Sequence, residues 1–223
     1  VFIGTIRFDT RRIRFNGSLL IRNTVGEFSF SSAGLSNSYG NLIIELMNGC
    51  DFGNRFGSSF SGVTSTLRVL GTSTMNLQGS GNVASMNNVE IAPAGKFNTF
   101  NTHPTENPAF NVLTSIEGLD GSSEFHNKAT LGILFNSTFM NTGKFYANYE
   151  RSIVLYNLNA DQMITVPIDS YNELRLMNAG TKRLAGNTVC SHLSFYGTAT
   201  LDLNGYSLTG YTKYTDAGNV NRN

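Results

Sequence analysis

Three carboxylates in the C-terminal half of the chain, Asp169, Glu173 and Asp202, are the side chains whose spacing could support acid–base chemistry. Enzymes that cleave polysaccharides need clustered carboxylates, or carboxylates together with Lys or Arg, on one outward face. The 15 acidic residues of this chain are widely scattered, and acidic residues beside inward leucines usually face solvent. We therefore expect no catalytic residues.

Metal and cofactor motifs are equally incomplete. The chain has three histidines, His103, His126 and His192. They lack the spacing of zinc ligands, and each is predicted to lie in a polar loop or corner. Residues 157–162 (NLNADQ) begin like a calcium loop, but Gln162 and Ile168 replace the required glycine and glutamate. Residues 79–84 (GSGNVA) match a dinucleotide motif without the helix that such a motif needs. We expect no metal and no cofactor.

Two arginines near the N-terminus, Arg12 and Arg14, alternate with Ile13 and Phe15. Alternation places the arginines on one face of a strand and the apolar residues on the other. This is typical of a half-buried strand with a charged exterior, and contact with an anionic surface glycan or a partner protein stays an alternative. The net charge is +1, so nucleic acid is not an expected partner.

The elements that must position these residues are predicted to be strands. The chain contains 27 asparagines and 23 glycines, while 40% of its residues are hydrophobic. Short segments with alternating apolar residues are separated by polar corners, and no segment is long and apolar enough to span a membrane. The expected strands are 12–22, 41–47, 65–71, 87–93, 129–135, 143–149, 152–158, 172–178 and 192–197.

A loose internal repeat favours stacked coils over a β-sandwich. Gly95-Lys96-Phe97 and Gly143-Lys144-Phe145 each begin a polar-flanked strand. Such imperfect similarity is expected when each coil buries the inward residues of its neighbours. Asn204-Gly205 lies between alternating apolar residues, where it could form either a hairpin turn or the corner of a coil. The residues alone leave β-solenoid and β-sandwich open.

Residues 163–210 resemble a motif of large secreted surface proteins of the Bacteroidetes. The similar positions are Val166-Pro167, Tyr171-Asn172, Gly180 to Lys182, Leu184 to Asn187, Leu201 to Tyr206, and Leu208-Thr209. The resemblance implies a right-handed parallel β-helix in adhesin-like proteins that often use type IX secretion. Asn204-Gly205 would then be a corner, with Leu201 and Leu203 pointing inward before it, and Tyr206 and Leu208 after it.

We predict one parallel β-helix domain over residues 1–211, followed by a polar exit segment or linker over 212–223. Val1, Phe2, Ile3 and Ile6 are expected to form an end strand whose edge needs a neighbour. That neighbour would be an adjoining domain of a longer chain or another copy in a head-to-tail array. Since Cys50 and Cys190 would lie several coils apart, we expect no disulfide between them.

These observations favour a non-enzymatic, extracellular structural or adhesion protein of a bacterial surface. Two alternatives remain: a subunit of a self-assembling head-to-tail filament, and a carbohydrate-active enzyme built on a β-helix. No cofactor is expected in the favoured case.

Overall fold

The computed structural model describes residues 6–8, 16–23, 26–30, 39–54, 63–77, 83–101, 109–137, 139–214 and 219–221, and every regular element in them is a strand. The first sheet has eleven strands: β2 (Asn16–Asn23), β4 (Tyr39–Leu46), β6 (Val63–Val69), β8 (Val83–Ile91), β10 (Ala109–Gly118), β12 (Thr130–Ile133), β14 (Ile153–Tyr156), β16 (Tyr171–Asn178), β18 (Thr188–Gly197), β20 (Leu208–Thr209) and β21 (Thr212–Tyr214). The second sheet has seven: β1 (Ile6–Phe8), β3 (Gly26–Phe30), β5 (Cys50–Asn54), β7 (Thr72–Leu77), β9 (Lys96–Asn101), β11 (Glu124–Lys128) and β13 (Lys144–Tyr146). The third has four: β15 (Gln162–Ile164), β17 (Thr181–Leu184), β19 (Thr200–Asp202) and β22 (Asn219–Asn221).

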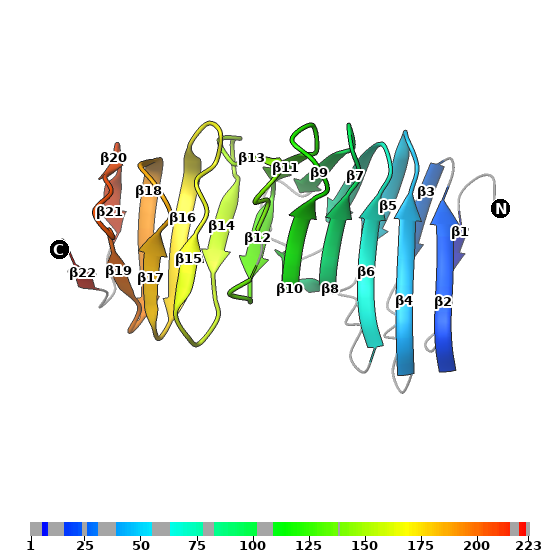
Figure 1. The fold of residues 1–223 in the computed structure, drawn as a ribbon, viewed down its shortest axis with the longest axis horizontal. Helices are drawn as coiled ribbons and strands as arrows, with labels where there is room; N and C mark the ends of the chain where they lie inside the picture. Colours follow the sequence, from blue (N-terminus) through cyan, green and yellow to red (C-terminus); the bar gives the residue numbers. More distant parts are fainter. Residues whose placement is uncertain are drawn as a thin grey trace.

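The strands form a parallel β-helix, as the sequence predicts. Each strand pairs in parallel with the equivalent strand of the next coil, and the coils stack along the long axis with the two termini at opposite ends (Figure 1). A coil uses about 19 to 28 residues, as the pairings Thr181↔Thr200 and Lys96↔Glu124 show. The β-sandwich alternative is wrong, because that architecture pairs its strands antiparallel. The right-handed sense of the coil remains a prediction.

Alternation along the strands builds a narrow apolar core. In β7 and in the first half of β8, every second side chain is buried. Phe97, Phe125 and Phe145 occupy equivalent positions on three successive strands, with ring centroids 5.3 and 5.7 Å apart. Phe125 is therefore covered by an identical ring on each side, whereas the other neighbour of Phe97 in the ladder is Ser73.

A ladder of polar side chains lies inside one corner of the coil. The Thr99 hydroxyl donates to the Asn127 side-chain oxygen at 2.8 Å, and the Asn127 amide donates to the Ser152 hydroxyl at 2.9 Å. All three residues are fully buried. Each bond joins one coil to the next, so the polar groups stay paired while they fix the alignment of the coils.

Asn204 and Gly205 form a corner and not a hairpin. Both have positive φ, 53° and 77°, and the Tyr206 N–H donates to the Leu203 carbonyl at 2.8 Å. Leu201 is buried, whereas Leu203 and Leu208 pack partly against the core. The expectation that Tyr206 points inward is wrong, since Tyr206 is 41% exposed. Its N–H closes the turn, and the next strand begins only at Leu208, so Tyr206 stays on the outer side of the corner.

Each of the nine expected strands overlaps an observed strand, and eight of these strands belong to the first sheet, although residues 12–15 of the expected strand 12–22 lie outside the described residues. Most of the second and third sheets, together with β10, were not expected. β21 and β22 fall within the segment predicted to be an exit or linker, and they pair with β18 and β19. In the described part of the chain no helix has the length and apolarity that a membrane crossing requires.

Several expected features lie at or beyond the edges of the described residues. Arg12, Arg14, Val1, Phe2 and Ile3 are outside them. Ile6 begins β1, the terminal strand of the second sheet. The two cysteines are both buried, one in β5 of the second sheet and the other in β18 of the first, with several coils between them.

Candidate functional site

The outer face of the second sheet carries a row of charged side chains on three successive strands. Lys96, Glu124 and Lys144 are in register at the starts of β9, β11 and β13. The Glu124 carboxylate lies 3.4 Å from the Lys96 ammonium and 3.9 Å from that of Lys144. The Gly-Lys-Phe repeat of the sequence thus places its phenylalanines in the core and its lysines two strands apart on the surface.

Glu124 also anchors a chain of hydrogen bonds that leads to Tyr149. The His126 Nε2 lies 2.9 Å from a Glu124 oxygen, and the Nδ1 lies 2.6 Å from the Tyr149 hydroxyl. Because the carboxylate can only accept, Nε2 carries the proton, and in the neutral ring Nδ1 accepts from the Tyr149 O–H. The imidazole also stacks on the Tyr146 ring, with centroids 4.4 Å apart. Tyr149 is therefore held in one position.

The pKa shifts of Glu124, His126 and Tyr149 favour the protonation states that these hydrogen bonds require. Burial lowers the pKa of His126, although the bond to Glu124 opposes this shift. The His126 hydrogen bond, followed by the influence of Lys96, lowers the pKa of Glu124. Burial raises the pKa of Tyr149. At neutral pH Glu124 is therefore a carboxylate, His126 a neutral imidazole and Tyr149 a protonated phenol.

The histidines correct one expectation from the sequence. His126 was expected in a loop or corner, but it lies within β11 with its side chain only 7% exposed. His192 likewise lies within a strand, β18, where one ring nitrogen is 3.3 Å from the Asn172 carbonyl. In a coil, an outward strand position can be covered by a neighbouring turn, as Tyr149 covers His126. His103 is outside the described residues.

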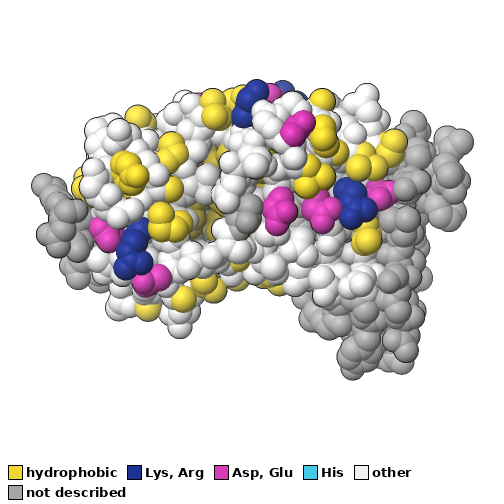
Figure 2. All heavy atoms as spheres, viewed as in Figure 1, with side chains coloured by type: hydrophobic (Ala, Val, Ile, Leu, Met, Phe, Trp, Pro, Cys, Tyr) yellow, Lys and Arg dark blue, Asp and Glu magenta, His cyan; other side chains and the backbone are white. Residues whose placement is uncertain are grey.

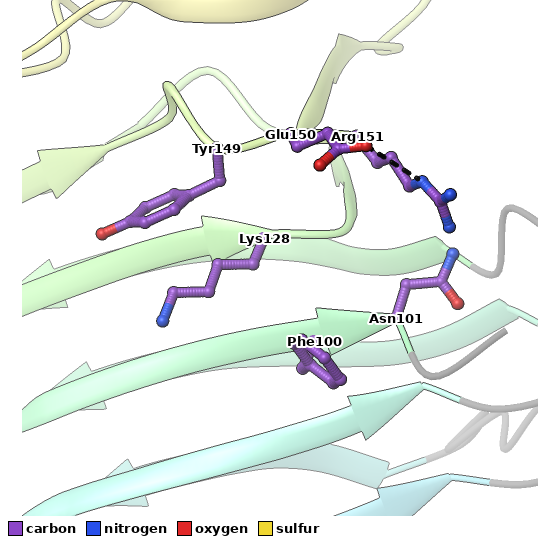
Figure 3. A pocket seen from close by; sticks show the side chains of 6 residues that line it. All are labelled: Phe100, Asn101, Lys128, Tyr149, Glu150 and Arg151. Atoms are coloured by element: carbon purple, nitrogen blue, oxygen red, sulfur yellow. Dashed lines mark ion pairs between the residues drawn. The ribbon is translucent and has the colours of Figure 1, made fainter. Parts of the chain in front are cut away.

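A shallow hollow of about 340 Å³ adjoins the hydrogen-bonded residues Glu124, His126 and Tyr149. It is lined by Phe100, Asn101, Lys128, Tyr149, Glu150 and Arg151. Lys128 lies on the strand between the one that carries Phe100 and the turn that carries Tyr149 (Figure 3). Its ammonium sits over the Tyr149 ring, 4.9 Å from the centroid. Burial, and to a lesser degree the nearby Lys96, lower the pKa of Lys128. Phe100 is 46% exposed.

Arg151 projects into the same hollow from a tight turn. The turn is closed by the Ser152 N–H, which donates to the Tyr149 carbonyl at 2.9 Å. Arg151 adopts a φ of 65°, which glycine or asparagine would tolerate more easily. Its guanidinium lies 3.9 Å from the Glu150 carboxylate, which is itself 92% exposed.

The three carboxylates singled out in the sequence are not brought together. Asp169 accepts hydrogen bonds from the backbone N–H groups of residues 147 and 148, at 3.0 and 3.1 Å. Glu173 pairs with Arg175 at 2.5 Å, and Asp202 pairs with Arg183 at 3.2 Å. Each carboxylate serves its own coil and its neighbour, so the structure places no pair of these acids around one substrate bond.

The side chains of the calcium-like segment 157–162 form hydrogen bonds with the next coil. The side-chain oxygens of Asn159 and Asp161 accept the backbone N–H groups of Ala179 and Thr181, at 3.3 and 2.8 Å. Asp161 also pairs with Arg183. Within the described ranges, no group of three or more His, Cys, Asp or Glu residues could hold a metal ion.

Elsewhere on the surface, opposite charges form short ladders across the coils. Arg68 bonds Glu45 and Glu90 at 3.1 and 2.8 Å, and Arg183 bonds Asp161 and Asp202. Figure 2 shows acidic and basic side chains gathered in such rows among uncharged surface. In both ladders one arginine faces two carboxylates. The second sheet reverses this balance, because two lysines there share Glu124.

Sequence reasoning missed this site. Glu124, His126 and Tyr149 come from two coils, and a separation of 23 residues between His126 and Tyr149 has no local motif. The available signal was the repeated Gly-Lys-Phe, which marks the same position on different coils. Comparisons with known protein families, with curated proteins and with solved structures find no match to this chain.

Proposed function

We propose that this chain is a non-enzymatic structural or adhesion element displayed outside a bacterial cell. The observation that carries the proposal is the continuous stack of parallel coils with its termini at opposite ends (Figure 1). Such a stack separates what is attached to its two ends, and it repeats outward side chains at a spacing of about 4.8 Å. Both properties suit a spacer that presents a binding face.

The resemblance of residues 163–210 to adhesin-like surface proteins supports the same proposal. This segment forms the coils that contain β15 to β20, with Asn204-Gly205 at a corner. Secretion and surface attachment follow from the resemblance and are part of the proposal. A head-to-tail filament of the same chain is a variant of it, since a parallel ladder can be continued by another copy.

The proposal is tested on intact cells of the source organism. An antibody raised against the chain should label unpermeabilised cells, and brief protease treatment of those cells should remove the signal. A deletion strain should attach less well to its surface than the parent strain, and the gene should restore attachment. Signal that appears only after permeabilisation would contradict the proposal.

One observation favours a carbohydrate-active enzyme as a second candidate. The Glu124–His126–Tyr149 hydrogen-bonded chain has the order of a carboxylate, an imidazole and a hydroxyl that catalytic sites use to move a proton. Against this candidate, burial raises the pKa of Tyr149, which makes its phenolate harder to form, and the His126 side chain is only 7% exposed. The same chain of bonds is well suited to holding Tyr149 in place.

A further inference from the structure

In the described part of the chain, the four cations at and beside the hollow, Lys96, Lys128, Lys144 and Arg151, outnumber the two carboxylates that pair with them, Glu124 and Glu150. Lys96 and Lys144 share the Glu124 carboxylate, which His126 also engages. Among the described residues no carboxylate lies within ion-pair distance of Lys128, and its ammonium rests on the Tyr149 ring instead. Its lowered pKa reflects burial and repulsion from Lys96. An anionic group in the hollow would offset both effects.

The hollow also offers an apolar surface beside its cations. Phe100 is in register with Lys128 on the neighbouring strand, and nearly half of its surface is exposed. An exposed phenylalanine ring on a sheet face can pack against the C–H face of a sugar ring, which is apolar. Tyr149 forms the opposite wall, where its hydroxyl is fixed by His126 (Figure 3).

The arrangement of the cations fits an extended ligand. Arg151 and Lys128 lie at the hollow, whereas Lys96 and Lys144 lie at the other end of the same strands, two strand spacings or about 10 Å apart. A guanidinium binds planar carboxylate and sulfate groups with two parallel hydrogen bonds, and an ammonium binds them as a point charge. A polymer with regularly repeated anionic groups could contact all four cations.

We propose that the hollow and the adjoining lysine row bind an extended acidic polysaccharide. The Lys128 and Arg151 side chains point in opposite directions along the hollow (Figure 3), so one carboxylate or sulfate contacts Lys128 and another contacts Arg151. One sugar ring packs on Phe100, and further anionic groups contact Lys96 and Lys144. This site gives the proposed adhesive function a class of ligand, and its biological role rests on that proposed function. Binding by the purified chain tests the site without any assumption about where the protein is located.

The test measures affinity of the 223-residue chain for three immobilised polymers: polygalacturonate, which is carboxylated, dextran sulfate, and unmodified dextran. Retention on at least one acidic polymer, with little on dextran, is expected. Preference between the two acidic polymers identifies the anionic group. Higher salt should weaken binding, because the contacts are exposed ion pairs. Equal binding to dextran, or no binding to either acidic polymer at low salt, would overturn the proposal.

Variants locate the site. Lys128→Gln combined with Arg151→Gln should weaken binding at least tenfold, and Phe100→Ala should weaken it several-fold with little change in its salt dependence. Arg183→Gln, which removes one cation from the third sheet, is the matched control and should bind like the parent chain. Circular dichroism must show the same fold in all four proteins. If the control loses as much affinity as the double variant, or if duplex DNA competes as well as the free acidic polymer that the chain binds, the proposed site is wrong.

Discussion

Replacement of Lys182 by methionine should destabilise the coils that contain β15 and β17. The Lys182 side chain is fully buried, and its ammonium donates to the carbonyls of Leu158 and Ala160 at 2.7 and 2.8 Å and to Gln162 Oε1 at 2.9 Å. Gln162 in turn donates to the Ile133 and Phe135 carbonyls of the preceding coil. The Lys182 ammonium therefore holds together the corner at residues 158–162, and it positions the Gln162 side chain, which joins this corner to the preceding coil.

The size of the effect follows from these bonds. Methionine fills the volume of the lysine stem but leaves the Leu158 and Ala160 carbonyls without their donor, whereas Gln162 Oε1 still accepts the Leu158 N–H. Each unsatisfied buried acceptor costs about 1–3 kcal/mol. Water can reach the corner carbonyls and removal of a buried charge offsets part of the loss, so we expect a net cost of about 2–4 kcal/mol. For a chain of this length each kcal/mol lowers Tm by about 2–4 °C.

The pH dependence of stability gives an independent measurement. Burial lowers the pKa of Lys182 to about 8, whereas an exposed lysine titrates near its usual 10.5. Between these two pH values the unfolded chain binds more protons than the folded chain, so stability should rise with pH in this window. Lys182→Met should remove that rise. Thermal unfolding at pH 7 and pH 9.5 tests both points, with Lys144→Met, at a partly exposed position, as control. A Tm equal to that of Lys144→Met at pH 7 would refute the reasoning.

Three further substitutions or reagents test separate parts of the structure. Gly180→Ala should cost much more stability than Gly205→Ala. Both glycines have positive φ, but only at Gly180 would the added methyl overlap the Ala160 backbone. Equal losses of Tm in the two variants would contradict the close approach of the coils at Gly180. Arg151→Gly should raise stability by about 1 kcal/mol through relief of its positive φ, yet weaken binding to acidic polysaccharide, and a loss of stability would be inconsistent with a strained turn. The Cys190 thiol, whose pKa burial raises to about 12, should react with Ellman's reagent only after unfolding; rapid reaction of the native chain would show that this coil is open.

The first sheet was predictable because its strands alternate apolar and polar residues over long runs. Segments such as 172–178 and 192–197 carry that pattern clearly, and both are strands in the structure. The second sheet is built from shorter strands whose inward residues include Ser73 and Thr99, and this polar content conceals the alternation. Such strands are stabilised by the equivalent strands of neighbouring coils, which a local sequence window does not contain.

The candidate site was less predictable than the fold for a related reason. Lys96 and Lys144 could be recognised as equivalent from the Gly-Lys-Phe repeat, but the coil between them starts with Ser123-Glu124-Phe125 and breaks the pattern. Tyr149 reaches His126 from a turn, and no periodicity in the sequence specifies where a turn side chain points. Alignment of the coils, which sets these contacts, becomes visible only when the strands are paired.

The measurement that tests the central claim most directly is to mix the purified chain with polygalacturonate and with dextran sulfate and to follow both the binding and the length of the polymer. A non-enzymatic adhesion protein should bind an acidic polymer and leave its size distribution unchanged after prolonged incubation. Shortened polymer, new reducing ends or the ultraviolet absorbance of an unsaturated sugar would contradict the account. Loss of that activity in Tyr149→Phe would then identify the Glu124–His126–Tyr149 chain as catalytic machinery.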